Sequence, residues 1–163
     1  MEGILSILFI MFDLWIVLGS VHMSNKDWQK AESCFHTALC LKNTPLNEKR
    51  LTTAYSRLGV LYMARGQANQ ALEVIEKAIN NAKTYNDAPR LCSSLQIMGD
   101  LYRLKGEDER SLQYYQQIIE LAKKYKYKKK EYQALNRLVQ RWEGINKRQL
   151  QKNLINEYIE QSN

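Results

Sequence analysis

Hydrophobic positions along this chain follow a helical rhythm, and a longer pattern recurs on top of it with a fixed period. Apolar residues recur three or four positions apart, and no convincing run of alternating β-branched residues suggests a strand. An apolar residue, two variable positions, an apolar residue and a glycine occur in order three times, with the glycines evenly spaced at Gly19, Gly59 and Gly99. A fixed period of this length predicts a stack of repeated helical units.

The second segment of each unit also has helical spacing, and it contains small residues. Small residues that share one helix face let a neighbouring helix pack closely. Because Ser111 and Ile118 stand in the third unit where the others have alanine, we expect looser or shifted packing there. The three sets are Ala31, Phe35 and Ala38, then Ala71, Ile75 and Ala78, then Ser111, Tyr115 and Ile118.

Glycines also mark the predicted turns within the units. Gly66 and Gly106 each follow the glycine of the first helix at the same distance along the chain, where a left-handed helix cap favours glycine. In the first unit, Asn25 tolerates the same conformation. We expect loops between the units around Pro45 and Pro89, because proline breaks helices.

The repeated motif resembles the tetratricopeptide repeat, whose first helix carries the pattern W-x2-L-G-x2-Y. The period exceeds the common length of about 34 residues. In this respect it is similar to the arrays of rapsyn, of cell-polarity adaptors and of the peptide-sensing bacterial regulators of the Rap and PlcR type. The matching stretches are Trp15-x-x-Leu18-Gly19-x-x-His22, Tyr55-x-x-Leu58-Gly59-x-x-Tyr62 and Leu95-x-x-Met98-Gly99-x-x-Tyr102.

The resemblance implies an all-α fold, a right-handed α-solenoid of helical hairpins that forms a single domain over residues 1–163. The three repeats are expected at about 7–45, 47–84 and 88–125. A degenerate fourth repeat at 131–161 would cap the stack, because a solenoid has to hide its last apolar face. Its second helix would carry Leu150 and Leu154 on the apolar side.

The segment from residue 4 to residue 21 is almost entirely apolar and is near the length of a membrane-spanning helix. Asp13 lies in its middle, where a charge in lipid is costly, and Leu18 and Gly19 are in register with the repeat. We therefore expect the first solenoid helix here, with a membrane segment as the alternative. A helix that is apolar nearly all round also predicts a covering partner, self-association or a missing upstream segment.

The net charge of +7 is concentrated in the second half of the chain, much of it in one lysine run that also contains two tyrosines. The run predicts a solvated basic loop. The alternative is a site for nucleic acid, anionic lipid or an acidic protein. This basic patch consists of Lys123, Lys124, Lys126, Lys128, Lys129 and Lys130.

No set of residues in the sequence matches a catalytic motif or a metal site, so we expect neither an enzyme nor a cofactor. His22 occupies the tyrosine position of the motif and is expected to pack. Cys34, Cys40 and Cys92 match no zinc spacing and are expected to be free thiols in a reducing compartment. We therefore expect a cytoplasmic protein.

In tetratricopeptide repeats the first helices line a concave groove, and the resemblance transfers this role to fixed positions. Arginine grips carboxylates with a planar fork, and asparagine amides pair with peptide backbone. The alternative is that these positions form ordinary solvated helix faces. The candidate peptide-binding residues are Arg57, Val60, Gln96, Asp100, Arg103, Asn136, Arg137 and Gln140.

The resemblance thus implies a non-enzymatic adaptor or scaffold that binds a peptide or helix of another protein, of acidic character if the arginines anchor it. One alternative is a peptide-sensing regulatory domain that acts on a partner in trans. Another is association with a membrane or with nucleic acid through residues 4–21 or 123–130; nucleic acid is not expected, and a membrane is not favoured. Nothing in the sequence identifies the partner.

Overall fold

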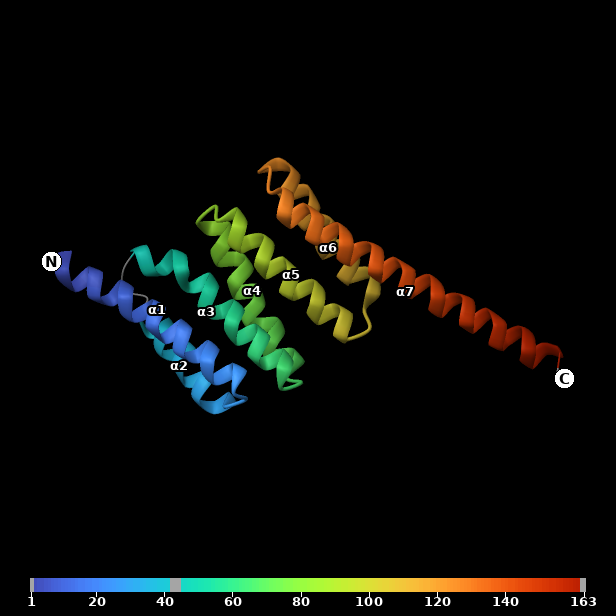
Figure 1. The fold of residues 1–163 in the computed structure, drawn as a ribbon, viewed down its shortest axis with the longest axis horizontal. Coiled ribbons are helices and arrows are strands. Elements are labelled where there is room, and N and C mark those ends of the chain that lie inside the picture. The colour runs from blue at the N-terminus through green and yellow to red at the C-terminus, as the bar shows by residue number, and fades with distance from the viewer. Residues whose placement is uncertain (1, 42–44, 162–163) are drawn as a thin grey trace.

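The computed structural model describes residues 2–41 and 45–161, and all regular secondary structure in these ranges is α-helical. Three consecutive hairpins are followed by one long helix (Figure 1). The predicted all-α solenoid is confirmed. The helices are α1 (Glu2–Ser24), α2 (Trp28–Cys40), α3 (Pro45–Ala64), α4 (Ala68–Thr84), α5 (Ala88–Leu104), α6 (Asp108–Lys124) and α7 (Lys128–Gln161).

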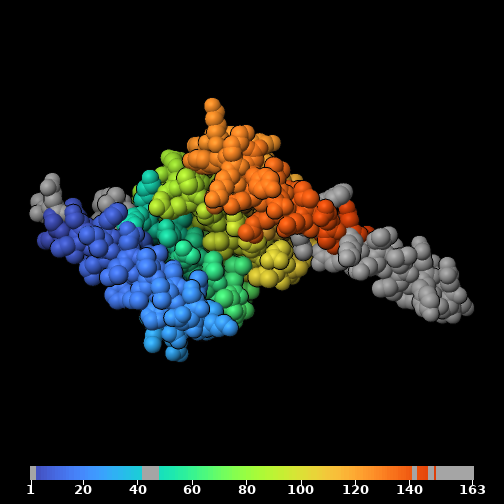
Figure 2. Space-filling model, viewed as in Figure 1, coloured from blue at the N-terminus to red at the C-terminus, as the bar shows by residue number. Residues whose placement is uncertain are grey.

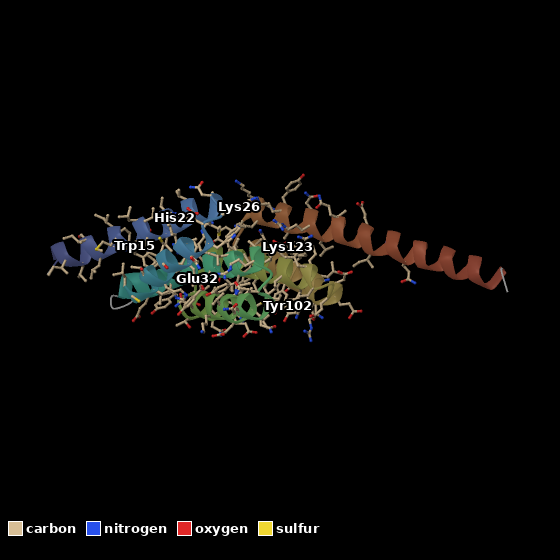
Figure 3. All side chains as sticks on the ribbon, turned by 90° about the horizontal axis from the view of Figure 1, so that it is seen from below. Trp15, His22, Lys26, Glu32, Tyr102 and Lys123 are labelled. Atoms are coloured by element: carbon tan, nitrogen blue, oxygen red, sulfur yellow. The ribbon has the colours of Figure 1, made fainter. Side chains whose placement is uncertain are left out.

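The helices form two layers, with the core between them. The first helices α1, α3, α5 and α7 lie side by side in front of α2, α4 and α6 (Figure 1). Seen from below, α1 and α7 lie along one side of the molecule, and α4 lies along the other (Figure 3). Fully buried side chains between the layers include Phe12, Phe35, Leu58, Ile75 and Met98. The apolar stripes of the sequence therefore face one continuous core.

Each first-helix glycine lies against the large residue of the second helix in the same hairpin. A Cβ at Gly19 would lie 2.5 Å from Cε1 of Phe35, and one at Gly59 would lie 2.5 Å from Cγ1 of Ile75. The third hairpin repeats this contact at 2.9 Å. A side chain would push the two helices apart, so these positions need glycine for the close approach.

The third hairpin is closely packed at both positions for which looser or shifted packing was predicted. Ser111 is fully buried, and its Oγ donates a hydrogen bond of 2.9 Å to the carbonyl oxygen of Gly99. Ile118 is buried as well. Serine is nearly as small as alanine, and here its hydroxyl finds an acceptor on the facing helix, so its burial leaves no polar group unpaired.

The turns after the helices share one geometry, in which one residue has a positive φ. From Gly66 onward these residues recur at half of the sequence period. In each turn an N–H bonds to the carbonyl five positions back, as in the 2.8 Å bond from Gln67 N to Tyr62 O, which is the Schellman pattern. Both predicted glycine caps are confirmed, whereas the first hairpin uses Lys26 and not Asn25. The residues with positive φ are Lys26, Gly66, Asn86, Gly106 and Lys126.

The prolines begin helices and do not break them, contrary to the prediction. Pro45 is the first residue of α3. Pro89 is the second residue of α5, where its missing N–H has no intrahelical partner to lose. The carboxylate of Asp87 caps α5 by accepting a hydrogen bond of 3.2 Å from the N–H of Arg90. The connection from α4 to α5 is therefore a short turn, and the extra residues of the long period lengthen the helices.

A basic residue near the start of a first helix reaches back to the preceding first helix. The donors are one sequence period apart, and so are their partners, so one contact recurs at each step of the array. We call this set the basic ladder, and it helps to hold neighbouring hairpins in register. The three pairs are Arg50 with Asp13, Arg90 Nε with Thr53 Oγ1 at 3.2 Å, and Lys130 Nζ with Ser93 Oγ at 3.1 Å.

The fourth unit is a single helix, because α7 runs without a break from Lys128 to Gln161. By comparison with Gly66 and Gly106, the period places a turn at residue 146, yet the helix continues through that position. The first part of α7 packs against α6 (Figure 1). The predicted cap at 131–161 therefore lacks its separate second helix. The side chains of Leu150 and Leu154 lie outside the described ones.

Candidate functional site

Six of the eight predicted groove residues line one hollow between α5, α6 and α7. This α5–α7 hollow has a volume of about 610 Å³. Tyr115, Tyr132 and Gln133, which the sequence analysis did not select, complete its lining. The six predicted residues around it are Gln96, Asp100, Arg103, Asn136, Arg137 and Gln140.

The other two predicted residues, Arg57 and Val60, line a smaller hollow of about 300 Å³ between α3 and α5. Arg57 is exposed, and its guanidinium has no ionic or hydrogen-bond partner among the described residues. Ser93 and Ile97 of α5 line the same hollow. Because α5 contributes to both hollows, they follow one another along the face formed by the first helices.

Asp100 connects the three helices that surround the α5–α7 hollow. Its carboxylate accepts a hydrogen bond of 2.8 Å from the hydroxyl of Tyr115 on α6 and one of 2.7 Å from Nη1 of Arg137 on α7. Nε of Arg103 lies 3.8 Å from the same carboxylate. Burial, followed by the hydrogen bond to Asp100, raises the pKa of Tyr115. The phenol therefore stays protonated, and remains a donor to Asp100, at neutral pH.

This network gives two of the predicted binding residues a structural role. Arg137 is not a free cation, because its Nη1 contacts both carboxylate oxygens of Asp100, at 2.7 and 2.9 Å. The pair joins α5 to α7 and fixes the width of the hollow. From the sequence alone, an arginine at a groove position is interpreted as a ligand-binding residue. The sequence does not show that it pairs with an aspartate 37 residues away.

Carboxamides make up much of the remaining lining. Gln96 lies on α5, while Gln133, Asn136 and Gln140 share one face of α7 at helical spacing. None of the four has a hydrogen-bond partner within the described part of the chain. A carboxamide both donates and accepts hydrogen bonds, so this set matches the alternating N–H and C=O groups of an extended peptide. The exposed ring of Tyr132 adds an apolar face beside them.

Comparison of the sequence with models of protein families identifies the type of repeat in this array. Two models of the tetratricopeptide repeat match the chain, one at residues 14–49 and the other at residues 50–124. The chain belongs to the tetratricopeptide repeat superfamily. The predicted resemblance is thereby confirmed. The matched residues include the predicted groove positions of α3 and α5, and they end before those of α7.

Solved structures share the fold of this tetratricopeptide repeat chain. Aspartyl phosphate phosphatase F from Bacillus subtilis has a TM-score of 0.77 and 14% identity, over 83% of this chain and 36% of its own. A kinesin light chain from Podospora anserina with nearly identical TPR-like repeats has a TM-score of 0.66 and 16% identity, over 90% of this chain and 72% of its own. This chain thus spans about a third of the phosphatase's length. No curated protein gives a significant sequence match.

The basic patch is not the continuous loop that was predicted. Only residues 125–127 form the turn, while Lys123 and Lys124 end α6 and Lys128 begins α7. Lys130 belongs to the basic ladder through its bond to Ser93. The rings of Tyr125 and Tyr127 stack on each other with their centres 5.8 Å apart, which occupies one face of each ring.

α1 is less covered than α3 and α5, the inner first helices of this tetratricopeptide repeat array. Residues Gly3–Ser24 are long and apolar enough to cross a membrane, with a mean hydropathy of 2.4, and only 17% of this stretch is buried in the structure. Phe12 and Ile16 point into the core. Asp13 pairs with Arg50 of α3, whose guanidinium lies 4.0 Å from the centre of the Phe9 ring. α1 is thus a repeat helix here, with an apolar outward side.

The thiols and imidazoles add no second site. Cys34 and Cys92 are buried, and burial raises the pKa of both thiols, which keeps them protonated and weakly nucleophilic. Nδ1 of His22 lies 3.5 Å from the carboxylate of Asp27. Within the described ranges, no group of three or more histidine, cysteine or acidic residues is placed to hold a metal ion.

Proposed function

We propose that this tetratricopeptide repeat domain is a non-enzymatic adaptor that holds an extended peptide of another protein in the α5–α7 hollow. Proteins with this type of repeat generally mediate protein–protein interaction. The observation that carries the proposal is the set of carboxamides on α5 and α7 that surrounds one hollow without partners in the described chain. The buried free thiols support a reducing, cytoplasmic setting for this work.

The charges around the two hollows suggest the polarity of the ligand. Arg57 is the unpaired guanidinium on this face, as far as the described residues go, and Arg103 is only partly neutralised by Asp100 at 3.8 Å. A peptide that lies across α5 from one hollow to the other would pass both groups. Arginine pairs best with a carboxylate, so the proposed ligand carries an acidic side chain or a C-terminus beside Arg57.

The first test uses peptides selected from a displayed random library against the full chain. Fluorescence anisotropy then compares the wild type with the double variant Asn136→Ala/Gln140→Ala. We expect the variant to bind about tenfold more weakly, because two hydrogen bonds to the peptide backbone are lost. Unchanged affinity would contradict the proposal.

The matched control is Gln113→Ala/Gln116→Ala, which removes two carboxamides of α6 that do not line the hollow. Its affinity should equal that of the wild type. Circular dichroism establishes that both double variants keep their helicity. An equal loss of affinity in both variants would place the peptide outside the α5–α7 hollow.

A second candidate is a peptide-sensing regulatory domain that acts on a partner in trans. Asp100 favours it, because one carboxylate joins α5, α6 and α7, and a ligand that competes for it would change the packing of three helices at once. The two candidates differ in one respect: a regulator changes its affinity for a second protein when the peptide binds.

A further inference from the structure

The first helices inside the array, α3 and α5, bury a set of side chains where they stack on the hairpin before them. α1 carries side chains at the equivalent positions. Met11, Leu14, Leu18 and Val21 of α1 are exposed. One period later, the equivalent positions in α3 are Leu51, Ala54, Leu58 and Leu61, and all four are buried. In α5, Ser94, Met98 and Leu101 are likewise buried. α1 therefore carries a complete stacking face that nothing in the described chain covers.

One position makes this face different from an ordinary stacking face. The basic ladder has Arg50, Arg90 and Lys130 at equivalent positions, and each reaches back to the preceding first helix. The same position in α1 is Ile10, which is exposed. An ordinary preceding hairpin would be held by the missing cation. An isoleucine where the other first helices have a cation favours an apolar contact of another kind.

The outward face of α1 also has the spacing and the charge of a helix–helix seam. Exposed apolar residues recur at intervals of three and four, which is the heptad rhythm of paired helices. Asp13 is neutralised by Arg50 on the α3 side. The whole helix contains no lysine or arginine, although helices that lie on anionic membranes rely on such residues. The seam consists of Ile4, Ile7, Met11, Leu14, Leu18 and Val21.

We propose that α1 is a dimerisation surface, on which the α1 helix of a second copy of this chain packs about a twofold axis. A twofold contact covers both exposed faces at once and closes the assembly, and no like charges meet across it. In the space-filling view, α1 forms the surface at one end of the molecule (Figure 2). The α5–α7 hollow lies on other helices, so it stays open in both copies and this inference is independent of the peptide proposal.

The test measures the mass of the full chain by sedimentation equilibrium, with Leu14→Glu as the variant. We expect two chains per particle for the wild type at tens of micromolar and one for Leu14→Glu, because two carboxylates would be buried across the axis. The control is Leu104→Glu, the same substitution at a similarly exposed leucine of α5 (61% against 59%), which should stay dimeric. A wild type that sediments as one chain would overturn the proposal.

A mixing experiment separates the twofold contact from other uses of α1. Leu14→Glu and Leu14→Lys should each be monomeric and should form a dimer when mixed, because position 14 of one copy lies near the seam centre of the other. If the mixture remains monomeric, the two α1 helices do not face each other and the inference fails. A monomeric wild type that co-sediments with phosphatidylcholine vesicles would overturn it as well, and would assign α1 to lipid.

Discussion

At the scale of single residues, small groups decide how closely the two layers approach. Gly59 of α3 faces Ile75 of α4 with no room for a side chain. In the third hairpin, Ser111 of α6 uses its hydroxyl to bond the backbone of α5. Both residues act across a helix pair within one hairpin, so their energetic effects belong to packing and not to intrinsic helix preference.

Substitution of Gly59 by alanine should therefore destabilise the protein although alanine is the better helix former. The new methyl would lie 2.5 Å from Cγ1 of the fully buried Ile75. Overpacking typically costs about 1–3 kcal/mol, against a gain of about 1 kcal/mol in helix propensity. We expect a net loss of up to about 2 kcal/mol in the free energy of unfolding, measured by urea denaturation.

The matched control for this substitution is Gly144→Ala. Gly144 lies inside α7, and nothing lies within 4 Å of a Cβ placed there. It should gain up to about 1 kcal/mol from propensity alone. If Gly59→Ala were stabilised as much as Gly144→Ala, the close approach of α3 and α4 would be contradicted.

At the scale of helices, the turns set the architecture. A residue with positive φ follows α1 and each helix from α3 to α6, and the hydrogen bonds of the turn are the same at glycine, asparagine and lysine. Lysine is the unusual choice, since a residue with a Cβ pays about 1–2 kcal/mol in this conformation. Lys26 and Lys126 therefore carry local strain that Gly66 and Gly106 avoid.

Substitution of Lys126 by glycine should relieve that strain. We expect the free energy of unfolding to rise by about 0.5–1 kcal/mol, because the gain is reduced by the greater flexibility of glycine in the unfolded chain. Thermal unfolding followed by circular dichroism measures the change. Lys129→Gly is the control: it places glycine in the first turn of α7 and should cost up to about 1 kcal/mol. Equal losses for both variants would show that residue 126 is not in a strained turn.

The elements that sequence reasoning predicted well are those with a strong local cause. The positions of Gly66 and Gly106 depend on backbone preferences that a sequence shows directly. The long α7 was missed for the opposite reason. A stretch without proline and with only Gly144 as a weak interruption fits one helix as well as two, and the choice between them depends on what the second half packs against.

At the scale of the whole molecule, contacts between residues far apart in the sequence join the hairpins into one array. The basic ladder and the bond from Arg137 to Asp100 are of this kind. A single sequence places such residues on the correct helix face, and all eight predicted groove residues do line the two hollows. It does not reveal which of them are already paired with each other.

The two ends of the array are unlike, and this shapes what the molecule can bind. α1 lies at one end of the array and α7 toward the other (Figure 1). α1 carries an exposed apolar face, and α7 carries carboxamides that line the α5–α7 hollow. Each end meets a different kind of partner in our account: a second copy at α1, and a peptide between α5 and α7. Loss of one interaction should leave the other intact, because no residue belongs to both surfaces.

The most direct test of the central claim follows side-chain amide signals by nuclear magnetic resonance during titration with a selected peptide. If the α5–α7 hollow holds the peptide, the amide groups of Asn136 and Gln140 should shift strongly while those of Gln113 and Gln116 stay in place. Shifts confined to α1 or to residues 123–130, with Asn136 and Gln140 unchanged, would contradict the claim and move the binding site away from the hollow.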